Sequence, residues 1–322
     1  MVLRIAFQMD PLQNLNVDTD STFRIAEEAL KRGHSLFYYK PDDLIFHENR
    51  IKAIGFNFTV SRNRKSHFSL GPETRVDLGS EFDVVWLRQD PPFNMSYITT
   101  THLLDFLNGE TLVFNNPFWV RNFPEKFLVL NYPELTPPTM IARNIEMIKL
   151  FQKKHGEIIV KPLYGNGGAG IFKISKSDSN LPSLVELFKS ISGEPLIVQK
   201  FVPEVLEGDK RIILINGEPV GAINRIPPKG EIRSNMHVGG KAQKTKLTSR
   251  DLEICSVIGP LLREKNQILV GIDVIGPYLT EINLTSPTGI QELEFYDKKN
   301  IAEKIWVCIE KNLQFGLSSR DL

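Results

Sequence analysis

The chain has 322 residues, a net charge of +1 and a hydrophobic content of 41%, which suit a soluble protein built from two or three packed units. This charge gives no support for a nucleic-acid partner, and no apolar run approaches the ~20 residues that span a bilayer. Cys255 and Cys308 are too few for a disulfide framework or a zinc site. Because the N-terminus reads as a strand and not as a signal peptide, we expect a cytoplasmic protein with no membrane partner.

Residues 1–123 alternate between strand and helix patterns, which is typical of an α/β domain with a parallel sheet. The first helix is expected to take Ser21 as its N-cap and to stop at Gly33. Residues 50–80 are polar and weakly patterned, so we expect an excursion or a mobile loop there. The expected strands are 3–9, 36–39, 84–88 and 111–115, and the expected helices are 21–32 and 96–108.

Two of these strands end in Asp-Pro, at Asp10 and Asp90, and Arg88 stands just before the second. Open α/β sheets bind ligands at the carboxyl ends of their strands, so Asp10, Arg88 and Asp90 are candidates for one edge of a cleft. Asp-Pro is also ordinary turn chemistry, and the pattern alone leaves both interpretations open.

A second unit follows Pro124, and strands predominate in it. Pro124 fits the first position of a helix over 125–131, and residues 133–138 resemble a linker. The expected strands are 157–162, 171–175, 196–202, 211–216, 219–225, 268–275 and 278–284, and the expected helices are 144–155, 182–192, 249–266 and 297–312.

An apolar strand over 158–162 carries Lys161 and leads into a loop with four glycines, Gly165-Asn166-Gly167-Gly168-Ala169-Gly170. Glycines let the backbone approach a ligand and direct several N–H groups at it, which suits phosphate oxygens. The pattern predicts strand–loop–strand and lacks Gly-Lys-Ser/Thr, so the common helix-bound phosphate motifs do not fit. The loop is either a phosphate cover or a β-hairpin without a ligand.

Residues 272–283 predict a β-hairpin that turns at Gly276-Pro277-Tyr278. If the turn centres on Pro277, Asp273 faces Glu281, and Asn283 projects from the same face of the sheet. Two facing carboxylates destabilise a sheet unless a cation lies between them, and three oxygen ligands suit Mg²⁺. A register shifted by one residue would instead direct Asp273 elsewhere.

Three further segments are less specific. Residues 196–204 could present backbone groups to a flat heterocycle, or they could form an ordinary buried strand. Residues 208–211 hold one acid and two bases, as a solvated charge run usually does. Residues 226–241 are basic and rich in glycine and proline, which is typical of an active-site lid or a disordered loop.

In order and spacing, these motifs resemble the bacterial glutathione synthetase family of the ATP-grasp superfamily, over nearly the whole chain. Each motif alone is weak, whereas the combination is highly specific. The resemblance implies an N-terminal α/β domain over 1–123, followed by an ATP-grasp fold with subdomains at 124–202 and 203–322. The motifs are Met9-Asp10-Pro11, Arg88-Gln89-Asp90-Pro91-Pro92-Phe93, Asn122-Phe123-Pro124-Glu125-Lys126, Lys161-Pro162, Gly167-Gly168-Ala169-Gly170-Ile171-Phe172, Gly208-Asp209-Lys210-Arg211, Gly239-Gly240 and residues 279–289.

The resemblance further implies a cytoplasmic homotetramer that uses ATP and Mg²⁺, or Mn²⁺ in its place, to join γ-glutamylcysteine and glycine into glutathione through an acyl phosphate. The implied roles are ATP binding by Lys126, Lys161, Gly165, Gly167, Gly168, Gln199, Lys200, Val202 and Asp209; catalysis by Arg211, Arg225 and Arg233; substrate binding by Asp10, Arg88, Asp90, Ser286, Pro287 and Thr288; and metal binding by Asp273, Glu281 and Asn283.

Two residues depart from the family pattern: Lys241 stands where an arginine is expected, and Gly289 stands where cysteine is frequent. Both leave the fine details of substrate contacts open.

Two other classes of protein remain. A different ATP-grasp carboxylate–amine ligase, acting on D-alanine or on protein side chains, would change the Asp-Pro end of the first domain. A non-catalytic ATP-binding regulator would lose metal ligands or lid arginines, and this chain retains both.

Overall fold

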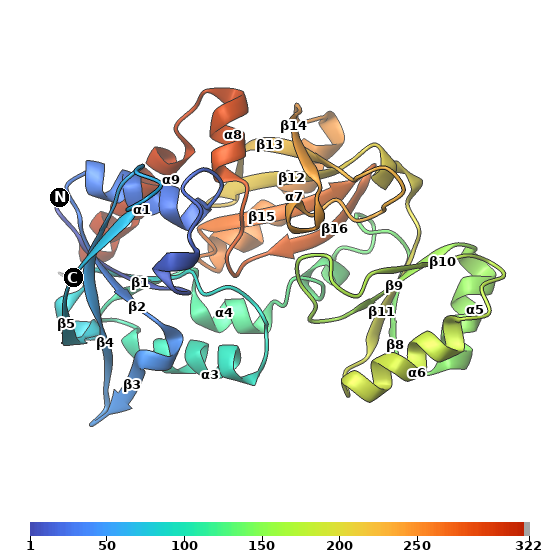
Figure 1. The fold of residues 1–322 in the computed structure, drawn as a ribbon, viewed down its shortest axis with the longest axis horizontal. Helices are drawn as coiled ribbons and strands as arrows, with labels where there is room; N and C mark the ends of the chain where they lie inside the picture. The colour runs from blue at the N-terminus through green and yellow to red at the C-terminus, as the bar shows by residue number, and fades with distance from the viewer. Residues whose placement is uncertain (319–322) are drawn as a thin grey trace.

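The computed structural model describes residues 1–318, which form three β-sheets with helices packed against them (Figure 1). We call the three parts the N-terminal domain, the small sheet and the large sheet. Figure 1 shows the small sheet and its two helices standing apart from the other two parts. No helix among the described residues is long and apolar enough to cross a membrane.

The N-terminal domain holds the parallel strands that the sequence predicts, in the order β2–β1–β6–β7. The N-cap of its first helix is Asp20 and not Ser21, because the Asp20 carboxylate accepts a hydrogen bond from Phe23 N at 2.8 Å. The elements are β1 Arg4–Gln8, α1 Ser21–Lys31, β2 Ser35–Tyr39, α2 Leu78–Glu81, β6 Val84–Leu87, α3 Met95–Leu104, β7 Leu112–Phe114 and α4 Pro117–Asn122.

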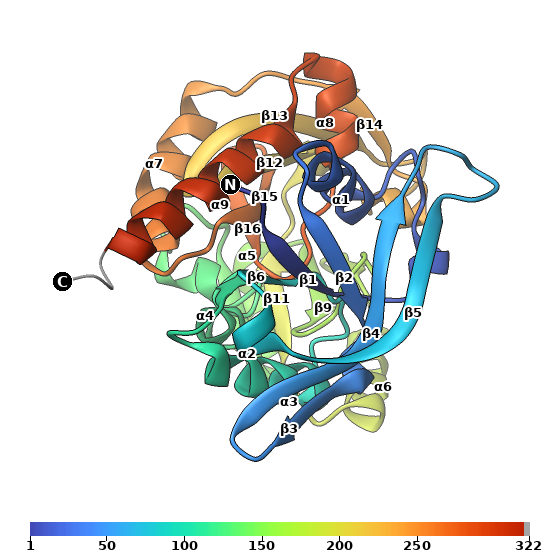
Figure 2. The same cartoon turned by 90° about the vertical axis from the view of Figure 1, so that its left-hand side faces the viewer.

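The expectation of a loop over 50–80 is wrong. This segment forms two long antiparallel strands, β4 Arg50–Val60 and β5 Phe68–Asp77, which join β3 Leu44–His47 at the edge of the sheet (Figure 2). Ile51, Ala53 and Gly55 are buried and alternate with more exposed residues, until an irregularity between Phe56 and Phe58 shifts the register. Such a half-buried strand has low average hydrophobicity, and only its two-residue period reveals it.

The small sheet has the order β10–β9–β11–β8, and all its pairs are antiparallel. Its helices bury Ile148, Phe151, Leu181, Leu184 and Val185 against it, in a hydrophobic core of its own. The elements are β8 Thr139–Ala142, α5 Ile145–His155, β9 Ile158–Pro162, β10 Phe172–Ile174, α6 Leu181–Ile191 and β11 Leu196–Lys200.

The helix expected over 125–131 is absent, and only a 3-10 turn, Leu128–Asn131, forms there. Tertiary hydrogen bonds explain the difference. The Ile282 N–H donates to the carbonyl of Glu125, and the Leu279 N–H donates to the carbonyl of Leu135. The segment is therefore held along the last strand of the large sheet and does not close its own helical ladder.

The large sheet is antiparallel, in the order β14–β13–β12–β15–β16. The helix expected over 297–312 begins later, at Ile301, and a helix that was not expected, α8, precedes it. Lys298 adopts a left-handed conformation between them, and Glu294 Oε1 accepts hydrogen bonds from the N–H groups of Ile301 and Ala302. The elements are β12 Asp209–Ile215, β13 Glu218–Ile226, β14 Lys241–Lys244, α7 Ser249–Glu264, β15 Leu269–Ile275, β16 Tyr278–Asn283, α8 Ile290–Asp297 and α9 Ile301–Ser318.

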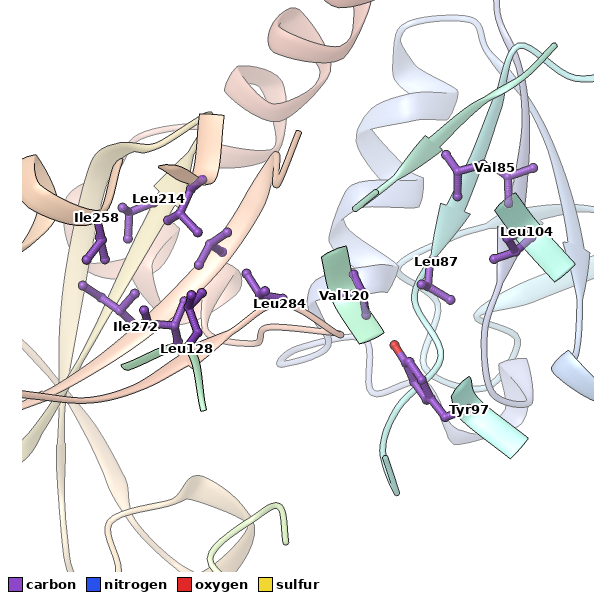
Figure 3. Packing of buried hydrophobic residues seen from close by; sticks show 14 of the residues in the cluster. Val85, Leu87, Tyr97, Leu104, Val120, Leu128, Leu214, Ile258, Ile272 and Leu284 are labelled. Carbon is purple, nitrogen blue, oxygen red and sulfur yellow. The ribbon is translucent and has the colours of Figure 1, made fainter. Parts of the chain in front are cut away.

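One hydrophobic cluster continues from the N-terminal domain into the large sheet (Figure 3). In that view Val120 and Leu284 lie at the facing edges of its two halves, with Leu87 beyond Val120 and Ile272 beyond Leu284. Asn115 adds polar links: its Nδ2 donates to the carbonyls of Leu269 and Leu284, and its Oδ1 accepts from Leu269 N. The N-terminal domain and the large sheet are thus packed as one body, beside the small sheet.

Candidate active site

A cavity of ≈ 840 Å³ is lined by residues of the N-terminal domain, the small sheet and the large sheet. Every site residue that the sequence proposes lines it, with the exception of Asp10. The Asp10 carboxylate instead accepts a hydrogen bond from Asp90 N at 2.8 Å, so it contacts the loop that carries a cavity residue. The structure therefore brings together side chains from distant parts of the chain.

The hairpin β15–β16 pairs Asp273 with Glu281, as the sequence predicts, and Asn283 lies opposite Gly271. Asp273 accepts hydrogen bonds from Arg211 at 2.6 and 3.0 Å, and Arg225 Nη2 lies 3.0 Å from it. Burial alone would raise the pKa of Asp273, but the two guanidinium groups outweigh it and hold that pKa well below its ordinary value.

Glu281 pairs with two lysines: its Oε1 lies 3.5 Å from Lys126 Nζ and 3.4 Å from Lys161 Nζ. These ammonium groups lower the pKa of Glu281 despite its burial. The two lysines differ. Burial lowers the pKa of Lys161, whereas Lys126 has Glu125 as a second carboxylate nearby, and its pKa is raised. Both lysines therefore gather at one carboxylate of the hairpin.

Asp209 extends this ionic network toward the segment 227–240. Arg225 Nη2 lies 2.6 Å from Asp209 Oδ2, and the Ser234 hydroxyl donates to the same oxygen at 2.8 Å. Burial raises the pKa of Asp209, and the Asp273 carboxylate adds to the rise, because Arg225 is shared between the two acids. Asp209 and Asp273 are consequently joined through their shared ion-pair partner, Arg225.

The glycine-rich loop joins β9 to β10, which pair as antiparallel strands, so the predicted strand–loop–strand arrangement is confirmed. Gly167, Gly168 and Gly170 all have positive φ angles. Lys126 Nζ donates to the carbonyl of Gly165 at 2.5 Å. A Cβ atom on Gly168 would lie 2.6 Å from Asn235 Oδ1, so the loop directly faces the segment 227–240.

The segment 227–240 connects β13 to β14 and forms only one 3-10 turn. Arg233, Ser234 and Asn235 line the cavity. Arg233 pairs with Glu231 at 2.5 Å, and this hydrogen bond lowers the pKa of Glu231 to about 2. The lid candidate thus borders the same cavity as the glycine-rich loop.

The small sheet supplies Gln199, Lys200 and Val202 at the end of β11. Lys200 N donates to Pro138 O at 2.9 Å, and Phe201 N donates to Glu157 O at 3.0 Å. Among the described residues, Val202 N has no backbone acceptor, which leaves it able to bind a ligand in the cavity.

At the opposite end, Arg88 is 3% exposed and donates to Thr22 Oγ1 at 2.9 Å and to Pro287 O at 3.3 Å. Burial lowers its pKa. The neighbouring carbonyl, Thr288 O, accepts from Arg211 Nη1 at 3.3 Å. Arg88 and Arg211 therefore contact consecutive peptide groups, which places the Asp-Pro end of the cavity next to the ionic network. Ser286 also hydrogen-bonds to Asp90.

The two departures from the family pattern lie in different surroundings. Gly289 has a φ of +108°, and a Cβ atom there would approach Ile223 Cδ1 to 3.3 Å. This left-handed conformation favours glycine at the position before α8. Lys241 begins β14 and is exposed.

Sequence reasoning missed three acidic residues that line the cavity, Asp20, Glu125 and Glu292. A signal existed for Asp20, because aspartate immediately before a helix is a common N-cap. Glu125 is beside Lys126 in one of the family motifs, yet only the fold shows that it hydrogen-bonds to Thr285 at 3.2 Å. Nothing in the sequence pattern marks Glu292.

The donor set at the hairpin fits a hard divalent cation. Asp273 and Glu281 offer carboxylate oxygens, and Asn283 uses its Nδ2 to donate to Gly271 O at 3.1 Å, which leaves its amide oxygen as a ligand. Residues 1–318 contain no group of three or more His, Cys, Asp and Glu side chains arranged to hold a metal ion. The candidate donors, Asp273, Glu281 and Asn283, are two carboxylates and an amide, a set of oxygen ligands that suits Mg²⁺ or Mn²⁺.

The arrangement of the three parts around the cavity is that of ATP-grasp ligases. A D-cycloserine synthetase structure superposes with a TM-score of 0.69 at 12% identity, covering 96% of this chain and 99% of that one. The D-alanyl-alanine synthetase A of Vibrio cholerae superposes with a TM-score of 0.62 at 14% identity, covering 97% and 98%. At these identities the similarity establishes the fold.

Sequence comparison is more specific. The prokaryotic glutathione synthetase N-terminal domain matches residues 3–121, and the prokaryotic glutathione synthetase ATP-grasp domain matches residues 125–298. The glutathione synthetase of Mesorhizobium japonicum is 53% identical over 96% of this chain and 99% of its own, and that of Brucella melitensis is 51% identical over the same shares. This chain belongs to the prokaryotic glutathione synthetase family.

Proposed function

We propose that this protein is an ATP-dependent ligase that joins γ-glutamylcysteine to glycine, producing glutathione, ADP and phosphate. Family membership supports the reaction. The observation that carries the proposal is the ionic network of the cavity, in which Lys126, Lys161, Arg211 and Arg225 meet the carboxylates of Asp273 and Glu281. The negative charges of a triphosphate could pair with the lysines and arginines, and a divalent cation could pair with the two carboxylates.

For the nucleotide, we assign the phosphates to Lys126 and Lys161, with the loop of Gly165, Gly167 and Gly168 above them. Positive φ angles at Gly167 and Gly168 support this role, because they expose backbone N–H groups. The adenine would be held at Gln199, Lys200 and Val202, and the ribose near Asp209.

For the metal, we assign Asp273, Glu281 and Asn283. A bound Mg²⁺ would neutralise negative charge on the phosphate oxygens, as it does in other phosphoryl-transfer enzymes. Mn²⁺ could use the same oxygen ligands. The lysine and arginine side chains that pair with Asp273 and Glu281 would then be free to bind the phosphates.

The chemistry follows from the weakness of a carboxylate as an electrophile. The terminal phosphoryl group of ATP is transferred to the cysteinyl carboxylate, the amine of glycine attacks the acyl phosphate, and phosphate leaves. We assign Arg211 to the terminal phosphate and Arg225 and Arg233 to the charge that develops. Positioning and electrostatic stabilisation supply the catalysis, so no side-chain nucleophile is needed.

Exclusion of water is the role we assign to the segment 227–240. An acyl phosphate hydrolyses in water, so a loop that closes over it preserves the coupling of ATP use to peptide-bond formation. Two observations support this role: the Ser234 hydroxyl donates a hydrogen bond to Asp209, and Asn235 lies next to Gly168 of the glycine-rich loop. The substrate would lie along Arg88, Asp90, Ser286, Pro287 and Thr288. Asp10 would act indirectly, through its hydrogen bond with the Asp90 N–H.

The proposed function is tested with purified protein, ATP, Mg²⁺ and γ-glutamylcysteine, with and without glycine. We expect ADP and glutathione in equal amounts only when glycine is present. ADP release that depends on D-alanine or a protein acceptor would indicate a different ATP-grasp ligase. Nucleotide binding without turnover would indicate a regulator.

The assembly and location of the enzyme are further proposals. By resemblance to its family, we propose a cytoplasmic homotetramer; the free thiols of Cys255 and Cys308 are consistent with a reducing compartment. Light scattering on the purified protein would measure the assembly, and a monomer or dimer would overturn it.

A further inference from the structure

Three charged residues at the Asp-Pro end of the cavity lie close enough to influence one another but form no direct ion pair. Arg88 is buried, and its Nη1 has no hydrogen-bond partner. Glu292 lines the same cavity from the first turn of α8, and its Oε2 is buried without a hydrogen bond. Asp20, also in the lining, uses one oxygen to cap α1. Within residues 1–318, none of these three side chains forms an ion pair of ≤ 4.0 Å.

The backbone holds these groups near one another. The Gln291 side chain donates to the carbonyls of Asp20 and Val17 at 2.8 and 3.1 Å, and Ile290 N donates to Ser21 Oγ at 3.3 Å. The first turn of α8 is thereby fixed on the loop that precedes α1. Asp20 accordingly raises the pKa of Glu292, in addition to the effect of burial, and burial also raises the pKa of Asp20.

Unpaired charges of both signs at one place suit a ligand that is itself a zwitterion. An α-amino acid group carries a carboxylate and an ammonium on one carbon. Arg88 is able to bind the carboxylate, and Glu292 with Asp20 the ammonium. Buried charges are unfavourable without a partner, so a ligand that supplies both charges is recognised strongly.

Among the proposed substrates, only one group carries a carboxylate and an ammonium on the same carbon without reacting. The γ-glutamyl residue keeps its α-amino acid group free, while the cysteinyl carboxylate reacts. Glycine is also a zwitterion, but its amine must lose a proton to attack. Two carboxylates that hold an ammonium would oppose that step.

Resting on the proposed function, we propose that Glu292 and Asp20 bind the α-ammonium of the γ-glutamyl residue beside Arg88, and so select γ-linked over α-linked glutamyl substrates. An α-linked peptide would present its ammonium next to the peptide bond and its free carboxylate on the side chain. Its ammonium and free carboxylate are on different carbons, so they could not bind the two acids and Arg88 at the same time.

The test uses Glu292→Gln, which removes the charge and keeps the shape, and Asp20→Asn, which also keeps an oxygen for capping α1. Glu303→Gln is the matched control, because Glu303 lies in the first turn of α9 and is exposed. Two analogues of γ-glutamylcysteine are measured as competitive inhibitors. Glutarylcysteine lacks the amino group, and 4-aminobutyrylcysteine lacks the carboxylate.

We expect Glu292→Gln to raise the KM for γ-glutamylcysteine roughly ten- to a hundredfold, as the loss of a charge-assisted hydrogen bond does. The inhibition constant of 4-aminobutyrylcysteine should rise in parallel, whereas that of glutarylcysteine and the KM for ATP should not change. Asp20→Asn should act in the same direction. Glu303→Gln should change nothing.

Two outcomes would overturn this inference. An equal loss of affinity for glutarylcysteine would show that the acids only maintain the shape of the site. Unchanged affinity for γ-glutamylcysteine in both variants would show that they do not contact it. The proposed function has its own readout, which is glutathione formation by the unsubstituted enzyme, so its failure is distinguishable from failure of the inference.

Discussion

The two ends of the cavity differ in whether their buried carboxylates are paired with cationic side chains. At the end proposed for the nucleotide, Asp273 and Glu281 are each paired with two cationic side chains, and their pKa values are lowered although both are buried. At the end proposed for the substrate, Asp20 and Glu292 form no ion pair within 4.0 Å among residues 1–318, and burial raises the pKa values of both, although the charge of Arg88 opposes the rise at Asp20. Burial acts in the same direction on all four carboxylates, so the partners account for the difference.

This contrast shows two ways to prepare a site for a charged ligand. At the first end each charge is already compensated by a neighbouring side chain, and these ion pairs would have to exchange partners if phosphates and a metal bind there as proposed. The unpaired end leaves its charges for the ligand to compensate, at a cost to the stability of the free protein. The same kind of substitution, glutamate to glutamine, should therefore have opposite effects on stability at the two ends.

The largest expected effect is the loss of turnover in Glu281→Gln. At ~4 Å a pair of unit charges is worth about 4 kcal/mol at an effective dielectric of 20, so a reduction in kcat of several hundredfold or more is expected. The measurement is the release of ADP at saturating ATP, γ-glutamylcysteine and glycine. Near-normal activity would remove Glu281 from the metal site, and Glu303→Gln serves as the control.

A smaller effect is expected when residues 227–240 are replaced by a tight turn. Ile226 pairs with Lys241, so a short turn can join β13 to β14 without a change of register. ATP binding should remain, while peptide-bond formation slows by about a hundredfold, the scale of a 1 Å misplacement. The ratio of ADP to glutathione at saturating glycine should rise above one, because the intermediate meets water.

Two results would change the interpretation of this segment. A slow variant that still makes one glutathione per ADP would show that the segment positions substrate without shielding it. A variant with the original rate and ratio would contradict the lid hypothesis.

Gly168→Val should raise the KM for ATP by about tenfold. Gly168 has a φ of +82°, and left-handed backbone costs a residue with a Cβ roughly 1–2 kcal/mol. The new side chain would also meet Asn235. Gly193→Val is the matched control, because Gly193 has no positive φ and a Cβ atom there would meet no described residue within 4 Å. If nucleotide affinity were the same in both variants, the loop would be an ordinary turn.

The smallest effect is on stability, where Glu292→Gln should increase the free energy of unfolding by about 0.5–2 kcal/mol, as neutral replacements at functional sites often do. Glu281→Gln should instead decrease it, since two lysines lose their counter-ion. Urea unfolding measures both.

The pH dependence of this gain has a definite sign. The pKa of Glu292 is raised in the folded protein above 4.5, so the carboxylate destabilises the fold once it is ionised in both states. The gain from Glu292→Gln should be complete above the raised pKa and should disappear as the pH falls below about 4.5. A gain that persists at low pH would mean that packing, not charge, is responsible.

The sequence was sufficient to predict that Asp273 pairs with Glu281, although the hairpin contains one feature that it did not reveal. Ile275 pairs with Tyr278, and this turn alone would set Asp273 opposite Thr280. An irregularity between Asp273 and Val274 shifts the register and brings Glu281 into place. The prediction centred on Pro277 therefore named the right pair, through a simpler turn than the one that forms.

Other features depend on tertiary contacts that no local pattern records. The strands over 50–77 have only a weak period, and residues 125–131 bond to β16 in place of a helix. Glu292 stands out because its Oε2 is buried without a hydrogen bond, which is a property of the assembled cavity. Glycine runs and paired acids could be predicted, because backbone freedom and strand alternation are local.

The separate core of the small sheet has a consequence for how the protein opens. Two hydrophobic clusters join the N-terminal domain to the large sheet, whereas the residues around Val160 and Val198 form a cluster of their own. The small sheet should therefore unfold as its own cooperative unit, at lower free energy than the remainder. Amide hydrogens of β9 and β11 should exchange first in the free protein and slow most on addition of ATP, because the cavity proposed for the nucleotide is lined by both units.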